Sequence, residues 1–193
     1  DAAFGIAPDP AELVSYAGRL GVAPARVDGP LFHLQPSGLV RMKQGPALAI
    51  VDLAPIGPDY LPGHAHADSL SFELSLFGQR VFVNSGTSEY GAGAERLRQR
   101  GTAAHNCVVV AGQNSSEVWD GFRVGRRART FDIHTDEADG TSIATGTHDG
   151  YRYLPRSPVH RRRFEMSSER LVVEDDVEPA CAAEAYFHLH PAI

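Results

Sequence analysis

Short segments in which apolar and polar residues alternate dominate the chain after residue 30. The clearest runs from 69 to 77, where an apolar side chain occupies every second position between serines and a glutamate. A period of two is typical of a strand with one buried face. Gly78 then permits a tight connection to the apolar run 80–84, so we expect the two segments to form a β-hairpin.

Similar runs bounded by turn residues predict the remaining strands. They are 39–42, 47–53, 106–111, 118–124, 129–134, 142–146, 162–166, 171–177 and 185–190. Polar turns at 136–140 and 167–169 join the four strands around them into two further hairpins. Many short strands with turns at close intervals favour an antiparallel arrangement.

One short helix is predicted near the N-terminus. Residues 10–20 place apolar side chains on one face, Asp9 is a candidate N-cap and Gly21 a candidate end. We therefore expect a mainly β protein with residues 1–30 as an N-terminal segment and residues 31–193 as one antiparallel β-sandwich domain. The segment 86–101 is long and rich in glycine and arginine, and a loop of that kind is usually functional or disordered.

Composition narrows the classes of function. The chain has 193 residues, enough for a substantial core, and a formal charge of −6, which argues against a nucleic-acid partner. No segment is long and apolar enough to span a membrane. Cys107 and Cys181 are too few for a disulfide framework, and Cys107 is expected to be a small buried hydrophobe. The start, without Met or a secretory signal, suggests a processed or excised piece of a longer protein.

Histidines 64 and 66 stand directly before the strand expected at 69–77. Side chains at i and i+2 of an extended backbone point to the same side, so both can reach one ligand. Asn84 ends the next expected strand and His105 opens a later one, so strand pairing could bring them to the same rim. Imidazole nitrogens together with an oxygen suit zinc. The alternative is that these histidines only form hydrogen bonds at strand ends.

A tyrosine and several arginines in 86–101 form a second candidate site. Tyr90 with Arg96 and Arg100 could bind an anionic sugar or carboxylate, since guanidinium groups pair well with such groups. The alternative is a solvated surface loop. Trp119 could stack on a sugar ring, but a core position is expected for it. The serine-hydrolase elbow, the phosphate-binding loop, the dinucleotide fingerprint and the HExxH zinc motif are all absent from the sequence.

An ordered series of motifs resembles the heparinase II/III-like family. The motifs are 63–74 (GHAHADSLSFEL), 81–87 (VFVNSGT), 101–106 (GTAAHN) and 116–128 (SEVWDGFRVGRRA), with Tyr90 and Arg96 between them; 187–191 (FHLHP) is similar more loosely. The resemblance implies an N-terminal α-helical incomplete toroid followed by antiparallel β-sandwich sheets. It also implies cleavage of uronic-acid-containing polysaccharides by β-elimination, and it favours a periplasmic or secreted location.

The resemblance implies roles for individual residues. His64 would line the active cleft, and His66, Asn84 and His105 would hold a zinc ion. Tyr90 and Arg96 would face the substrate, an acidic polysaccharide. The family commonly has aspartate where this chain has Asn84, and the loss of that charge should weaken zinc binding.

The family's catalytic tyrosine and its asparagine or histidine partners belong to the helical toroid, and this chain has no room for one. We therefore expect the chain to be the sandwich part of a lyase that needs its toroid as a partner and is inactive, or nearly so, alone. A non-catalytic carbohydrate-binding or structural sandwich with a metal site is the first alternative. A metal-binding module with another enzymatic use is the second.

Overall fold

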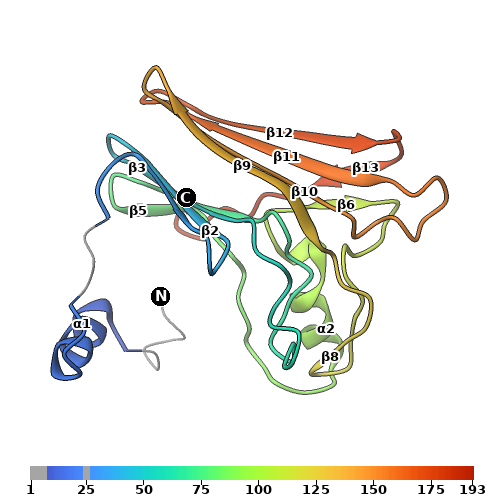
Figure 1. Ribbon diagram of the computed structural model, residues 1–193. Coiled ribbons are helices and arrows are strands. Elements are labelled where there is room, and N and C mark those ends of the chain that lie inside the picture. Colours follow the sequence, from blue (N-terminus) through green and yellow to red (C-terminus); the bar gives the residue numbers. More distant parts are fainter. Residues whose placement is uncertain (1–7, 24–26) are drawn as a thin grey trace.

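The computed structural model describes residues 8–23 and 27–193. Two antiparallel sheets form its two main layers (Figure 1). Within each sheet, strands that follow one another in sequence pair with one another, so both sheets are meanders. The five-stranded sheet contains β1 (Leu31–Leu34), β2 (Leu39–Gln44), β3 (Ala47–Asp52), β4 (Phe72–Leu76) and β5 (Gln79–Phe82); the four-stranded sheet contains β9 (Thr130–Ala138), β10 (Thr141–His148), β11 (Val159–Met166) and β12 (Leu171–Glu178).

Smaller elements fill one end of the molecule. They are α2 (Ala94–Arg100), a 3₁₀ turn (Thr102–Ala104), β6 (Val108–Val110), which pairs with β13 (Ala183–Ala185), and the hairpin of β7 (Val118–Trp119) with β8 (Arg123–Val124). Figure 1 shows α2 and β8 below the two sheets. None of the described helices is long and apolar enough to cross a membrane.

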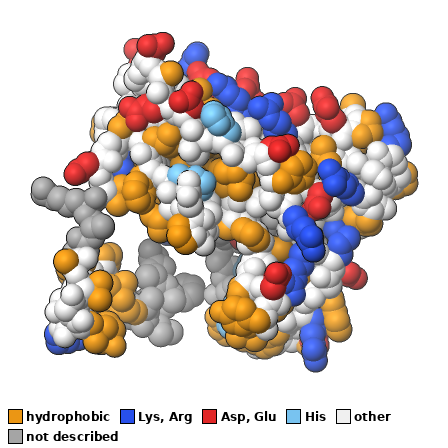
Figure 2. Space-filling view, in the orientation of Figure 1, with side chains coloured by type: hydrophobic (Ala, Val, Ile, Leu, Met, Phe, Trp, Pro, Cys, Tyr) orange, Lys and Arg blue, Asp and Glu red, His pale blue; other side chains and the backbone are white. Residues whose placement is uncertain are grey.

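The core lies between the two large sheets. Alternate residues of β2, β3 and β4 are buried against residues of β10 and β11, and the Phe72 and Phe164 rings meet at 5.5 Å between centroids. The fully or nearly fully buried apolar side chains of this core are Val40, Met42, Ala49, Val51, Leu53, Leu70, Phe72, Leu74, Ala144, Phe164 and Met166. Burial of such side chains is the main stabilising contribution to a fold. The predicted sandwich is confirmed. Charged side chains lie along the upper edge of Figure 2, where the four-stranded sheet turns its outer face to solvent.

The predicted N-terminal helix is present as α1 (Pro10–Arg19). Asp9 accepts a hydrogen bond from the backbone N–H of Glu12, and the Glu12 side chain accepts one from the Asp9 N–H, which completes a capping box. None of the side chains of α1 is buried. The helix therefore gains little from packing against the described sheets.

Several predicted boundaries were wrong. The strand expected at 69–77 begins only at Phe72, because Leu70 has φ +64° and interrupts the extended backbone. The segment 86–101 contains α2 rather than only loop. The single strand expected at 118–124 is a hairpin that turns at Asp120, where φ is +52°. The strand β1 was not predicted at all, and β13 ends where the last strand was expected to begin.

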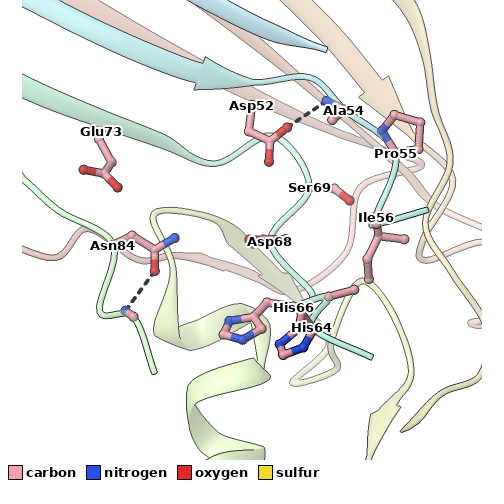
Figure 3. Close-up of a pocket in the computed structure, with 13 residues that line it drawn as sticks. Asp52, Ala54, Pro55, Ile56, His64, His66, Asp68, Ser69, Glu73 and Asn84 are labelled. Carbon is pink, nitrogen blue, oxygen red and sulfur yellow. Dashed lines mark hydrogen bonds between the residues drawn. The ribbon is translucent and has the colours of Figure 1, made fainter. Parts of the chain in front are cut away.

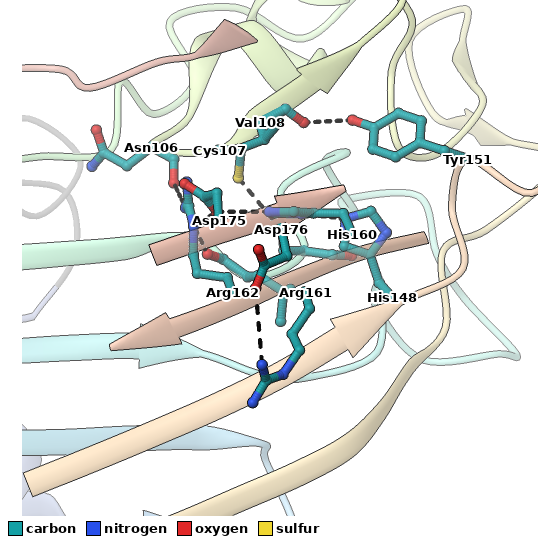
Figure 4. A network of polar contacts seen from close by, with 12 residues as sticks. Asn106, Cys107, Val108, His148, Tyr151, His160, Arg161, Arg162, Asp175 and Asp176 are labelled. Carbon is teal, nitrogen blue, oxygen red and sulfur yellow. Dashed lines mark hydrogen bonds and ion pairs between the residues drawn. The ribbon is translucent and has the colours of Figure 1, made fainter. Parts of the chain in front are cut away.

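A buried polar network, here called the closed network, fastens the four-stranded sheet to the layer below it (Figure 4). Its members are His148 of β10, His160 and Arg162 of β11, and Asp175 of β12. The Arg162 guanidinium donates from Nε and Nη2 to the two Asp175 oxygens at 2.6 and 3.0 Å. Its Nη1 donates to the backbone oxygens of Leu70 at 3.0 Å and Asn106 at 2.5 Å. Arg162 thus anchors the segments next to His66 and His105.

Candidate active site

The loop that carries His64 and His66 lies between β3 and β4. It is held by Arg100 of α2, which is fully buried and donates from Nε and Nη2 to the Ala65 carbonyl, both at 3.1 Å. The Ala67 N–H donates back to the Arg100 carbonyl at 2.8 Å. Nη1 of Arg100 also donates to the Asp120 carbonyl at 3.1 Å, which ties the β7–β8 turn to the same point. Arg100 therefore fixes the backbone between the two histidines.

His64 lies at the surface in an aromatic cluster. Its ring meets those of Tyr90 and Phe122 edge to face, at 5.8 and 5.9 Å between centroids. The Tyr90 and Phe122 rings are stacked at 6.0 Å with 8° between their planes. Tyr90 is 66% exposed and Phe122 48%. Exposed aromatic faces beside a histidine suit the apolar faces of sugar rings. Phe122 was not singled out from the sequence, because an isolated Phe in a strand-like run gives no sign of exposure.

His66, His105 and Asn84 form one chain of hydrogen bonds. Asn84 Oδ1 lies 3.1 Å from His105 Nδ1, and His105 Nε2 lies 3.3 Å from His66 Nδ1. Because an amide oxygen can only accept, His105 carries its proton on Nδ1 and accepts on Nε2 from His66. His66 Nε2 then accepts from Arg96 Nη1 at 3.2 Å. The structure thus brings all three predicted metal-site residues together, and Arg96 ends this series of hydrogen bonds.

Both histidines are neutral in this arrangement. Burial, followed by the charges of Arg96 and Arg100, lowers the pKa of His66 to about 4. Burial, followed by the proximity of His66, lowers the pKa of His105 to about 3. Neutral imidazole is the form that accepts a hydrogen bond and the form that binds a metal.

A zinc ion requires ligand atoms that converge on one point. The separation of 3.3 Å between His66 Nδ1 and His105 Nε2 matches two ligands of a tetrahedral site with zinc–nitrogen distances of about 2.0–2.1 Å. Asn84 Oδ1 faces the opposite ring nitrogen of His105, so it orients this ring as an outer hydrogen-bond partner does. The described residues contain no group of three or more His, Cys, Asp or Glu side chains placed to hold a metal. Direct binding of zinc by Asn84 stays a prediction.

Arg96 lies in α2 and its side chain is fully buried, so it is not part of an exposed loop. Besides His66 it donates to Thr87 Oγ1 at 3.0 Å and to the Gly121 carbonyl at 3.3 Å, and its guanidinium carbon lies 5.3 Å from the centre of the Tyr90 ring. Arg96 and Arg100 therefore contact protein groups. This could not be predicted from the sequence, because the helix that carries them was expected to be a loop. Arg98, the third arginine of α2, is exposed and forms an ion pair with Glu95 at 2.6 Å.

A cavity of about 370 Å³ opens beside the two histidines (Figure 3). Besides His64, His66 and Asn84, its polar lining includes Asp52, Asp68, Ser69 and Glu73. Burial raises the pKa of Asp52 to about 6. Burial and the nearby charge of Asp52 raise the pKa of Asp68 to about 7. Asp52 was missed in the sequence because it ends a strand with no motif around it.

Other predictions had mixed outcomes. Cys107 is 1% exposed, as expected of a small buried hydrophobe. Trp119 is 51% exposed and lies under the Arg123 guanidinium at 5.9 Å, so the expected core position was wrong. His148 and His160 belong to no motif in the sequence, and both are buried in the closed network.

Comparisons with known proteins agree with this architecture. Residues 26–193 match the family model described as heparinase II/III-like, C-terminal. Among solved structures, a heparan sulfate lyase HepC mutant from Pedobacter heparinus is similar with a TM-score of 0.64 and 18% identity, over 92% of this chain and 27% of that one. Heparinase III is similar with a TM-score of 0.61 and 20% identity, over 88% of this chain and 26% of that one.

A heparinase III-BT4657 gene product is also similar, with a TM-score of 0.59 and 21% identity, over 86% of this chain and 25% of that one. The chain thus spans about a quarter of the length of these structures. No curated protein matches the sequence. The match to the family model covers most of the chain, so the protein belongs to the heparinase II/III-like family and carries its C-terminal domain.

Proposed function

We propose that this chain forms the sandwich side of the substrate cleft in a polysaccharide lyase that cleaves uronic-acid-containing chains by β-elimination. The observation that carries the proposal is the position of His64, which lines the cavity and stands at the surface against Tyr90 and Phe122. Membership in a family of polysaccharide lyases supports the reaction class.

The reaction defines what the site must supply. β-Elimination requires neutralisation of the uronate carboxylate, removal of the proton at C5 and protonation of the leaving O4. His64 is exposed and can hydrogen-bond to a substrate carboxylate or hydroxyl, and Tyr90 offers a ring and a hydroxyl beside it. Arg96 and the neutral His66 hold this wall in place from behind. We propose that the remaining acid and base come from a helical toroid in the same protein, so the chain alone binds without turnover.

Binding and turnover test the proposal separately. The chain is mixed with uronate polysaccharides, binding is measured by calorimetry, and the unsaturated uronate product is followed by absorbance. We expect binding that falls about tenfold in His64→Ala and Tyr90→Ala, as loss of one hydrogen bond or one stacked ring predicts. His134→Ala, which removes an exposed histidine on β9, should bind normally. Absence of binding contradicts the proposal, and robust turnover contradicts the inactivity of the chain alone.

A non-catalytic carbohydrate-binding sandwich is the second candidate. The engagement of Arg96 and Arg100 with protein groups favours it, because neither guanidinium is free to neutralise a substrate charge. The two candidates differ in the protein that includes the toroid. A lyase should lose about 10²–10⁴-fold in kcat with His64→Ala if His64 assists proton transfer. A binding module should have no turnover to lose.

We further propose that His66 and His105 bind zinc, with Asn84 holding the His105 ring. Zinc would take the place of the proton between His66 Nδ1 and His105 Nε2 and fix the two rings; the neutral His66 ring would then carry its proton on Nε2, and Arg96 would keep its bonds to Thr87 and Gly121. Elemental analysis of the purified chain should find zinc that is lost in His66→Ala. Asn84→Asp should bind zinc more tightly, because a carboxylate adds charge in either a ligand or an orienting role. Zinc-free protein together with unchanged stability of His66→Ala would contradict the metal site.

A further inference from the structure

The cavity beside His64 is unusual in its charge. Three carboxylates line it, and its lining includes no lysine or arginine. Glu73 is paired with Arg80 at 2.6 Å. Asp52 and Asp68, by contrast, have no ion-pair partner among the described residues, although both are partly buried. A cleft that binds an acidic polymer would not place uncompensated carboxylates where the polymer's own anionic groups bind.

The cavity also has more hydrogen-bond acceptors than donors. Asp52 accepts one bond, from the Ala54 N–H at 2.8 Å, and no described side chain donates to Asp52 or Asp68. Ser69 is 5% exposed, and its Oγ has no hydrogen-bond partner in the described structure. Figure 3 shows Ser69 with Asp52 and Asp68 around one space. An unpartnered buried hydroxyl costs stability, so its retention points to a ligand that completes it.

We propose that this cavity binds the free ammonium group of an amino sugar, with Asp52, Asp68 and Ser69 as the receiving groups. An ammonium group offers three donors, one positive charge and no acceptor, which complements a site of carboxylate and hydroxyl oxygens. This inference rests on the proposed function, because it places one sugar unit of the polysaccharide in the cavity beside His64. It specifies the chemical class of that sugar unit.

Other ligands fit the cavity less well. A sulfate or uronate group would meet Asp52 and Asp68 with the same sign of charge. A hydroxyl or an N-acetyl group would leave both carboxylates uncompensated. A metal ion held by Asp52 and Asp68, separate from the zinc proposed at His66 and His105, would have only these two carboxylates and the Ser69 hydroxyl as ligands, fewer than a hard cation usually takes. An organic cation satisfies both the charge and the acceptors.

The position of the cavity orders the sugar units. His64 lines the cavity and also contacts Tyr90 and Phe122. An amino sugar seated in the cavity therefore places its neighbour in the polymer on the aromatic cluster. A uronate there has its carboxylate beside His64 and away from Asp52 and Asp68. The predicted substrate alternates uronate with an amino sugar that is neither acetylated nor sulfated on nitrogen.

Three methyl glycosides test this inference directly. Methyl glucosaminide, its N-acetyl derivative and methyl glucoside are titrated into the chain at a pH at which the amine is protonated. Shifts of the Ser69 and Gly57 amides are followed by NMR. We expect the free amine to bind at least about tenfold more tightly than the other two, since charged hydrogen bonds are the stronger ones. Asp52→Asn and Asp68→Asn should each abolish this preference, and Asp139→Asn, an exposed turn residue with φ +52°, should retain it.

Equal binding of the three glycosides, or no binding by any of them, would overturn the inference. So would a preference for the amine that survives both Asp52→Asn and Asp68→Asn. The comparison of ligands on the unaltered chain does not depend on whether a variant folds. Failure of the proposed function is distinct, because it appears as absent polysaccharide binding or cleavage while the methyl glucosaminide still binds.

Discussion

The closed network and the cavity beside His64 contain similar groups in opposite states. In the closed network every polar atom has a partner. The Gly150 N–H donates to His148 Nδ1 at 3.1 Å, His148 Nε2 to His160 Nδ1 at 3.0 Å, and His160 Nε2 to Asp175 at 2.7 Å. Arg162 neutralises the carboxylate. In the cavity, Asp68 and Ser69 have neither a cation nor a hydrogen-bond donor among the described side chains.

The carboxylates of the two regions differ in how they affect the stability of the fold. Burial acts to raise the pKa of Asp175, but hydrogen bonds from His160 and Arg162 outweigh it and lower the pKa to about 2. The pKa of Asp52 is raised because burial outweighs its one hydrogen bond, from the Ala54 N–H, and the pKa of Asp68 is raised by burial and by the nearby charge of Asp52. A folded protein retains such unfavourable groups where a ligand uses them. The carboxylate in the closed network stabilises the fold, whereas those in the cavity reduce its stability.

The largest expected effect comes from opening the closed network. Asp175→Ala leaves the Arg162 guanidinium fully buried without its counter-charge, which should lower the free energy of unfolding by about 3–5 kcal/mol. Urea unfolding measures this. Asp176→Ala, one residue along β12, removes an exposed partner 3.9 Å from Arg161 and should stay close to wild type. An equal decrease in the free energy of unfolding in both variants would mean that burial does not determine how much an ion pair stabilises this sheet.

A smaller effect is expected in α2, next to the cavity. Arg100→Lys loses the planar fork that reaches both the Ala65 and Asp120 carbonyls, so it should lower the free energy of unfolding by about 1–3 kcal/mol. Arg98→Lys in the same helix should leave thermal unfolding unchanged, because that side chain is exposed. If Arg100→Lys is also silent, Arg100 does not hold the loop of His64 and His66.

The smallest expected effect is on pH dependence. Burial lowers the pKa of His148 well below its usual value. Below pH about 6.5 the unfolded chain therefore binds a proton at His148 that the folded protein does not bind. As the pH decreases, the free energy of unfolding decreases by up to about 1.4 kcal/mol per pH unit from this one group. His148→Gln should remove that part of the slope between about pH 6 and 5. His134→Gln, on the exposed face of β9, should not, and equal slopes in the two variants would refute the role of burial.

Much of the fold followed from local pattern. Alternation predicted the hairpins β4–β5, β9–β10 and β11–β12, because one face of each strand is buried. The capping residue Asp9 located α1. Local pattern failed at β1 and α2. The buried side chains of the short helix α2 are polar, and two of them, Arg96 and Arg100, contact segments distant in sequence.

The candidate site was predictable only in part. Motif order placed His64, His66, Asn84 and His105 near one another, and the structure brings the last three into one hydrogen-bonded chain. The acidic side of the cavity could not be inferred. Asp52 joins it from another strand, and the unpartnered state of Ser69 depends on which donors the fold excludes. Both properties arise from tertiary packing, which the pattern of apolar and polar residues in the sequence does not reveal.

One pair of isosteric changes tests the contrast most directly. The free energy of unfolding is measured at about pH 8 for Asp68→Asn and Asp175→Asn. The pKa of Asp68 is raised to about 7, so the folded protein at that pH bears the cost of a buried charge that asparagine removes. Asp68→Asn should therefore raise stability, by more than about 1 kcal/mol, while Asp175→Asn lowers it. Loss of stability in both variants would contradict the claim that Asp68 destabilises the folded protein and is retained to bind a cationic ligand.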